Sequence, residues 1–192
     1  MGVALESARL FDETQRLFKA EQQRAAELAV INSIQQGIAS KLDFQAIIDL
    51  VGDKLREVFH TGDMAIRWWD EKESRTQWLY VYEHGKRLQV SPSRLRAGGP
   101  TDRALHTREV QLWNPSGSSD VVAGTDVSKS MVVVPIIGSD RALGTIQLEN
   151  HEREDAFGEA EIRLLTTVAG GMGIALENAR LFDETQRLFK AE

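Results

Sequence analysis

A cluster of cationic side chains between residues 86 and 109 is the clearest chemical feature of this sequence. The stretch holds six Lys or Arg residues and two acidic ones, in a chain whose formal net charge is −6. Because guanidinium groups make paired, charge-assisted bonds to carboxylates and phosphates, such a patch beside a pocket would attract an anionic ligand. The alternative is a solvated loop whose charges serve only solubility. The six cations are Lys86, Arg87, Arg94, Arg96, Arg103 and Arg108.

Large aromatic side chains gather in segments whose apolar residues alternate as in β-strands. Trp78, Tyr80 and Tyr82 are spaced two apart, which predicts that they share one face of a strand. Aromatic residues around a pocket suit a planar ligand. Aromatic residues are also favoured in strands for packing alone, so core packing is the default explanation for at least half of them.

The sequence offers little for catalysis or metal binding. It contains no cysteine, which excludes disulfides, thiolate metal sites and a cysteine nucleophile. No pair of nucleophile and base stands out, and we expect no catalytic residue, no metal site and no enzymatic activity. The histidines are scattered without the spacing of a metal-binding motif; they are His60, His84, His106 and His151.

Apolar periodicity predicts the elements that must hold these residues. Helical spacing predicts one helix over residues 5–38, a second from 44 to about 62 with capping oxygens in Ser40 and Asp43, and a closing helix over 157–192. The remaining predicted elements are hairpins formed by 64–69 with 76–82 and by 131–137 with 142–148, a short helix at 100–106, and a short strand at 110–113, the last two within the irregular stretch 83–130.

Composition limits the broad class of protein. An apolar content of 42% and a charged content of 27% are typical of a soluble globular domain of ordinary size. The negative net charge argues against nucleic-acid binding. No apolar run approaches the roughly 20 residues of a membrane-spanning helix, and the amino terminus has no apolar signal core. We therefore expect a cytoplasmic protein.

The two ends of the chain are near-copies of each other. Residues 172–192 repeat residues 1–21 at an offset of 171, with differences only at Val3/Ile174 and Ser7/Asn178. A fixed period marks a repeated unit. We interpret the chain as one unit of a tandem array, in which the closing helix of each unit is the opening helix of the next. The alternative is a single domain flanked by two similar surface helices.

The stretch from 130 to 182 carries a family resemblance. In SMVVVPIIGSDRALGTIQLENHEREDAFGEAEIRLLTTVAGGMGIALENARLF, an apolar strand with a late Pro135 is followed by a turn at Gly138, a strand centred on Gly144 and Phe157 before a helix. With these features the chain resembles the GAF domain over about 42–181. The resemblance implies an α+β, PAS-related fold with a central antiparallel sheet of about five to six strands. It also implies long N- and C-terminal helices on one face and a small-molecule pocket on the other.

Members of this family serve in bacterial sensor kinases, cyclases and phosphodiesterases, often in tandem and joined by signalling helices. Cyclic-nucleotide-binding members carry Asn-Lys, then Phe, three residues and Asp-Glu. Here Asn150, Phe157 and Glu161 match, but His151 and Ile162 replace the Lys and the second acid. A strand end and a helix cap explain every retained residue, which argues against a cyclic nucleotide. Covalent bilin attachment and methionine sulfoxide reduction in the family both need Cys, so the cofactor stays unknown.

Together these features predict a linker helix at 1–39, a GAF-like core at 40–158 and a closing helix at 159–192. We expect a non-enzymatic sensory module of a larger bacterial-type signalling protein, which binds a small molecule and relays its state through the end helices. The alternative is a ligand-free dimerisation spacer. We expect Arg103, Trp113 and one of the tyrosines to border one cavity. The candidate ligand-binding residues are Trp68, Tyr80, Tyr82, Arg103, His106 and Trp113.

The end helices also carry apolar residues without an obvious partner. Burying a Leu or Phe side chain is worth roughly 1.5–3 kcal/mol, but only if a second helix supplies a groove. The closing helix has apolar residues at alternating steps of three and four, typical of a coiled-coil seam or one side of a bundle. We favour a parallel homodimer over pairing of the two ends within one chain. The predicted interface residues are Leu10, Phe11, Leu17, Phe18, Met172, Leu176, Leu181, Phe182 and Leu188.

Overall fold

The structure, a computed structural model, describes residues 2–41, 43–60, 63–114 and 126–190. Its helices are α1 (Gly2–Ala39), α2 (Phe44–Phe59), α3 (Pro100–Thr107) and α4 (Glu159–Lys190). Its strands are β1 (Met64–Asp70), β2 (Arg75–Glu83), β3 (Lys86–Arg87), β4 (Ser93–Arg94), β5 (Gln111–Trp113), β6 (Ser130–Ile137) and β7 (Ala142–Asn150). Parts of the predicted repeat, second helix and irregular stretch lie outside the described residues. These residues are Met1, Leu42, Thr61, Gly62, 115–125, Ala191 and Glu192.

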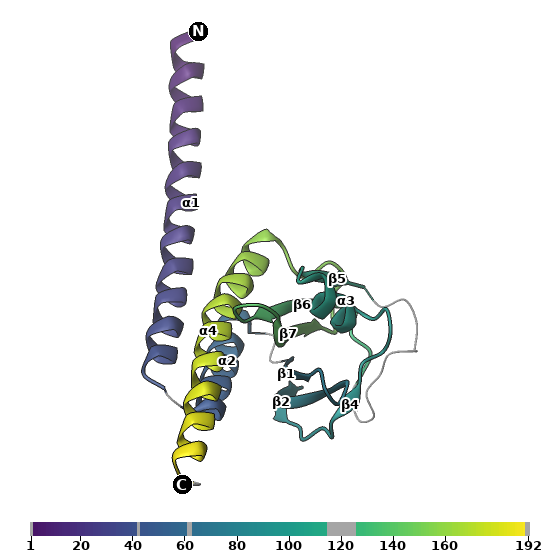
Figure 1. Cartoon of the computed structure of the whole chain (residues 1–192). Coiled ribbons are helices and arrows are strands. Elements are labelled where there is room, and N and C mark those ends of the chain that lie inside the picture. Colours follow the sequence, from purple (N-terminus) through teal and green to yellow (C-terminus); the bar gives the residue numbers. More distant parts are fainter. Residues whose placement is uncertain (1, 42, 61–62, 115–125, 191–192) are drawn as a thin grey trace.

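The strands form one antiparallel sheet with helices on both faces (Figure 1). The strand order is β3-β2-β1-β7-β6-β5, and β4 pairs with the outer part of β2. Helices α2 and α4 pack on one face, and α1 lies against both of them. Helix α3 covers the other face beside β5, β6 and β7. The predicted α+β fold, with long terminal helices on one face of an antiparallel sheet, is confirmed.

The helices begin and end where the sequence carries capping residues. The carboxylate of Asp43 accepts a hydrogen bond from the backbone N–H of Ala46 at 2.8 Å, at the start of α2. The Glu161 carboxylate accepts one from the Gly158 N–H at 2.9 Å, at the start of α4. Asn150 ends β7, and its side-chain oxygen accepts from the N–H groups of Glu152 and Arg153. Asn150 and Glu161 therefore have local structural roles. This agrees with the interpretation that they end a strand and cap a helix and are not part of a cyclic-nucleotide motif.

The core lies between the sheet and the three long helices, and α4 approaches β6 very closely. A methyl group at Gly173 would lie 2.0 Å from the carbonyl oxygen of Ile137, so only glycine allows this contact. Met172 and Leu176 are fully buried in the same core. The apolar seam of α4 therefore packs on its own domain along this stretch. The prediction that Met172 and Leu176 lie in a dimer interface was wrong, because both are buried in this domain's own core. The spacing of an apolar seam does not tell which surface covers it.

A bulge in β2 changes which side chains share a face of the sheet. Ile66 of β1 pairs with Tyr80, whereas the next residue, Arg67, pairs with Trp78, so Leu79 is an extra residue in β2. An extra residue reverses the alternation beyond it. Trp78 therefore lies on the face away from α2, and Tyr80 lies on the helix face. The prediction that Trp78 and Tyr80 share a face was wrong.

Helices α1 and α4 run side by side in the same direction (Figure 1). Arg163 and Glu27 form an ion pair at 3.2 Å, and Gly171 lies beside the side chain of Gln35. The first half of α1 extends away from the domain, and the two termini lie at opposite ends of the molecule. The two copies of the repeat do not pair with each other within this chain.

We predict opposite effects for two glycine-to-alanine changes in α4. Alanine at an exposed helical position is more stable than glycine by roughly 0.5–1 kcal/mol. Gly170→Ala should therefore raise the free energy of unfolding by about that amount, since nothing lies within 4 Å of the added methyl group. Gly173→Ala should instead lower it by roughly 1–3 kcal/mol, because α4 must move away from β6. Urea denaturation followed by circular dichroism measures both changes, and equal shifts would contradict the contact.

Candidate functional site

A cavity of about 290 Å³ lies on the sheet face opposite α2. Its floor is made by residues of β1, β2 and β7 whose side chains alternate with those of the helix-side core. Its walls come from residues 93–102, which include β4 and the start of α3, and from 126–131 before and in β6. Trp78 and Trp113 supply aromatic surface. The cavity has the size and mixed lining of a site for a small molecule.

The cation on the floor of the cavity is Arg67 of β1, which is half-buried. Its guanidinium carbon lies 3.6 Å from the centre of the Trp78 ring. Its Nη1 donates a hydrogen bond to Thr101 Oγ1 at 3.0 Å, and its Nη2 donates to Gln147 Oε1 at 2.7 Å. Its Nε is buried without a partner among the described residues. Burial lowers the pKa of Arg67 to about 10, partly offset by the charge of Glu149, so the group stays positive at neutral pH.

The basic cluster predicted from the sequence is divided by the fold. Arg94 and Arg96 line the cavity. Arg87 instead binds Asp49 of α2 at 2.6 Å, and Arg108 donates to the backbone oxygen of Asp140 at 2.5 Å. The hydrogen bond with Asp49 raises the pKa of Arg87. The positive charge at the cavity therefore comes from part of the predicted cluster together with Arg67, which lies outside it.

The candidate ligand-binding residues lie in three places. Trp113 and Tyr82 line the cavity, although the Tyr82 ring stacks against Arg56 at 3.6 Å on the helix side. Trp68 packs edge-on against Phe44 of α2 with ring centres 5.0 Å apart. Tyr80 is fully buried and its hydroxyl donates to Asp53 at 2.7 Å.

Arg103 and His106 lie on α3, whose first turn borders the cavity, but both are exposed and neither is among the lining residues. His106 pairs with Asp102 of the same helix at 3.0 Å. The structure thus brings Trp113 to the cavity, whereas the rings of Trp68, Tyr80 and Tyr82 lie on the opposite face of the sheet. The bulge at Leu79 explains why Tyr80 lies on the helix side and not in the cavity with Trp78.

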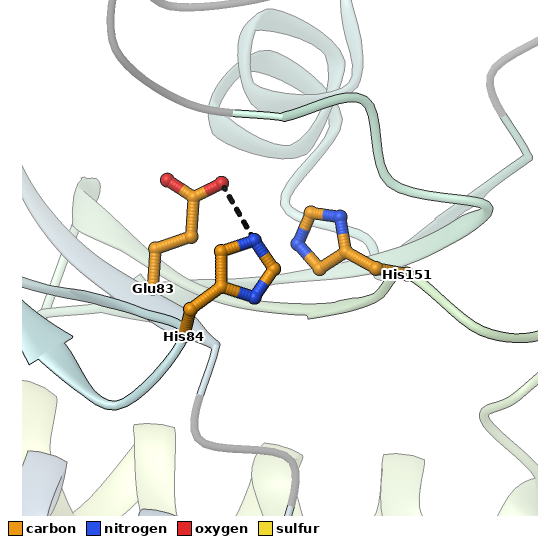
Figure 2. A group of neighbouring side chains, drawn as sticks. All are labelled: Glu83, His84 and His151. Atoms are coloured by element: carbon orange, nitrogen blue, oxygen red, sulfur yellow. Dashed lines mark ion pairs between the residues drawn. The ribbon is translucent and has the colours of Figure 1, made fainter.

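The other end of the cavity is acidic and is lined by His151, with the ring of His84 beside it. Figure 2 shows the rings of His84 and His151 and the carboxylate of Glu83 converging, and the ring centres are 5.1 Å apart. His84 Nε2 lies 2.9 Å from Asp126 Oδ2 and 3.9 Å from Glu83 Oε1. The hydrogen bond with Asp126 raises the pKa of His84.

Two further carboxylates complete this acidic end. Asp63 Oδ2 and Glu149 Oε2 lie 3.6 Å and 3.9 Å from His151 Nε2. Burial raises the pKa of Glu149, opposed by its hydrogen bond with Gln147. Gln147 also accepts from Arg67, so a chain of side chains on β1 and β7 joins the basic and acidic parts of the cavity.

Sequence spacing missed the two histidines, but strand register could have found them. Met64 of β1 pairs with Tyr82 on one side and with Leu148 on the other. His84 and His151 follow those partners by two and three residues, so both emerge at the same end of β1. Arg67 gave no such signal, because one cation in an apolar strand also fits a solvent-facing position.

Comparisons with known proteins support the fold and assign the family. The family model for the GAF domain matches residues 41–177. In a structure of the GAF domain of an Acinetobacter phosphoenolpyruvate-protein phosphotransferase, the TM-score is 0.68 at 16% identity, covering 81% of this chain and 95% of that one. Free methionine-R-sulfoxide reductase from Neisseria meningitidis, in complex with its substrate, has a TM-score of 0.68 at 18% identity, covering 82% and 92%.

One curated relative is the formate hydrogenlyase transcriptional activator FhlA of Escherichia coli (strain K12). It is 22% identical over an alignment of 173 positions, which covers 83% of this chain but only 24% of the relative. The chain thus spans about a quarter of that protein's length. With the family model matching most of its residues, this chain belongs to the GAF domain family. Across the described helices, none is long and apolar enough to cross a membrane.

We predict that Tyr80 acts in the core and not in the cavity. Tyr80→Phe removes the hydrogen bond to Asp53 and should lower the free energy of unfolding by roughly 0.5–1.5 kcal/mol. Tyr82→Phe is the matched control, because its hydroxyl has no hydrogen bond to the described residues, and it should change stability little. Urea denaturation of both variants is the measurement. Equal stability of the two variants would show that the Tyr80 hydroxyl is not held as described.

Proposed function

We propose that this GAF domain is a non-enzymatic, cytoplasmic sensory module that binds a small anionic molecule in its cavity. The observation that carries the proposal is Arg67, whose two amino groups bond to neutral oxygens and whose Nε is buried without a partner among the described residues. A buried charge is stable only when it is well paired. A carboxylate or phosphate near Arg67, Arg94 and Arg96 would supply that pairing.

The absence of cysteine supports a binding function and not an enzymatic one. One protein of similar structure is a methionine sulfoxide reductase. The resemblance to the GAF family implies that this reaction needs a cysteine. The chain has the same fold without a thiol to carry a redox step. The cavity therefore retains what binding needs: a half-buried cation, aromatic surface and hydrogen-bonding groups.

The proposed signal path runs from the cavity through β7 and β6 to α4. Gln147 and Glu149 face the cavity, whereas Ile146 and Leu148, their neighbours along β7, are buried in the helix-side core. Helix α4 contacts β6 at Gly173 with almost no intervening side chain. We infer that the chain is one unit of a tandem array, with 40–158 as its core and 1–39 and 159–192 as connecting helices.

Ligand binding can be tested with purified protein in two ways. Native mass spectrometry should detect a co-purified small molecule. Thermal unfolding should respond to at least one of four probes: acetate, succinate, glycine and inorganic phosphate. A probe at about 100 times its dissociation constant adds roughly 2.7 kcal/mol, which corresponds to a rise in Tm of roughly 5–10 °C for a chain of this size.

We predict that Arg67→Gln and Arg94→Gln each abolish most of that shift, because both guanidinium groups face the cavity. Arg103→Gln is the control with the same loss of charge, and it should keep the shift because Arg103 is not a lining residue. Circular dichroism verifies that each variant is folded. A protein that carries no molecule and responds to none of the probes would instead be the ligand-free spacer, and the proposal would fail.

We also propose a parallel homodimer formed by the exposed halves of the end helices. Leu10 and Leu17, and likewise Phe11 and Phe18, are seven residues apart, and all four are more than half exposed. In the second copy Leu181 and Phe182 are about half exposed and Leu188 is more so. Isolated helices of this length are marginal in water. A second chain would supply the missing groove for both copies.

We predict that Leu17→Glu combined with Leu188→Glu yields monomers in sedimentation velocity, while the sheet stays folded. The control is Arg16→Gln with Arg187→Gln, which changes the net charge equally on the opposite side of each helix and should leave the dimer intact. The unmutated protein sedimenting as a monomer at high concentration would refute the dimer.

A further inference from the structure

Two histidines and a glutamate meet at the acidic end of the cavity. Glu83 is the last residue of β2, His84 follows it, and His151 follows the end of β7 (Figure 2). One potential ligand atom from each of these residues lies within 4.8 Å of the other two. We propose that Glu83, His84 and His151 bind a divalent transition-metal ion, for which Zn²⁺ is the appropriate probe.

The hydrogen bonds of His151 determine which ring nitrogen is available. Its Nδ1 lies 3.3 Å from the backbone oxygen of Val127, and a carbonyl oxygen can only accept, so Nδ1 carries the proton. In the neutral ring Nε2 then holds a lone pair. That Nε2 is buried with no hydrogen-bond partner among the described residues, and it points into the cluster. Metal-ligating histidines characteristically donate their other N–H to a carbonyl in this way.

The backbone conformation at His84 also supports a role of this residue as a metal ligand. His84 adopts a positive φ of 48°, a conformation that side-chain-bearing residues rarely use. Its N–H donates to Asp63 Oδ1 at 2.5 Å, which stabilises this turn and places the imidazole beside Glu83. Glu83 is in turn held by the N–H of Asp126, which donates to Glu83 Oε1 at 2.6 Å. The Glu83 carboxylate and the His84 imidazole are thus positioned by hydrogen bonds, and a bound ion would replace the proton through which His84 Nε2 bonds to Asp126 Oδ2 at 2.9 Å.

The ligand set favours a transition metal over a hard cation. Two imidazoles with one carboxylate suit Zn²⁺ and its neighbours, whereas Mg²⁺ and Ca²⁺ prefer sites made of oxygen alone. Asp63, Asp126 and Glu149 also surround the cluster, and a divalent cation would reduce the repulsion among these carboxylates. Since the cluster borders the cavity, a bound ion would face a ligand held there. The site does not depend on the anion site at Arg67.

The experiment is a calorimetric titration of the chelator-treated full chain with ZnCl₂, with MgCl₂ as comparison. We expect one Zn²⁺ per chain and no heat from Mg²⁺. His84→Gln and His151→Gln should each weaken Zn²⁺ binding roughly tenfold or more, as loss of even a supporting group does at such sites. His106→Gln is the matched control and should bind as tightly as the unmutated chain, because that exposed histidine lies on α3 outside the cluster.

Two further measurements make the outcome decisive. Substitution with Co²⁺ should produce visible absorption bands in the unmutated chain and in His106→Gln, but not in the double variant His84→Gln/His151→Gln. Circular dichroism identifies any variant that fails to fold, and Glu83→Gln then serves as its replacement. Zn²⁺ binding that survives the double variant, or no binding at all, would overturn the proposal. Anion binding is tested separately in the presence of chelator, so either site can fail alone.

Discussion

The extra residue at Leu79 in β2 controls what each face of the sheet can do. On one side of it, Trp78 joins Arg67 in the cavity. On the other side, Tyr80 turns toward α2, where a methyl group at Gly52 would lie 2.4 Å from its ring. The same bulge therefore fills the helix-side core with an aromatic ring and leaves a cation–aromatic pair facing the cavity. Without it, strict alternation would put Tyr80 into the cavity and remove its partner Asp53.

The second constraint is that the sheet is a single layer between the cavity and the helices. Successive residues of β7 alternate between the two sides, so Gln147 bonds to Arg67 while Ile146 and Leu148 pack in the core. Any displacement of Gln147 therefore acts on a strand that is tightly packed from behind. Because protein cores are densely packed, little empty space is present between β7, β6 and α4 to absorb such a displacement.

The sequence predicted what local signals specify and missed what depends on pairing between distant strands. Both hairpins, the helix at α3 and the caps at Asp43 and Glu161 have local signals, and the structure contains them. The bulge at Leu79 had no signal, since both faces of β2 carry large apolar groups. His84 and His151 meet only because β1 lies between β2 and β7, which no local spacing reveals.

The relative position of α1 and α4 keeps the two repeated segments apart within one chain. The pairs Glu27–Arg163 and Gln35–Gly171 join residues 136 positions apart, whereas the two copies are 171 positions apart. The copy at the start of α1 is thus shifted by 35 residues from the position that would place it beside the copy in α4. At about 1.5 Å per residue this is roughly 50 Å along the helix axis. Leu10 and Leu17 accordingly stay more than half exposed, which is the observation on which the proposed pairing with a second chain rests.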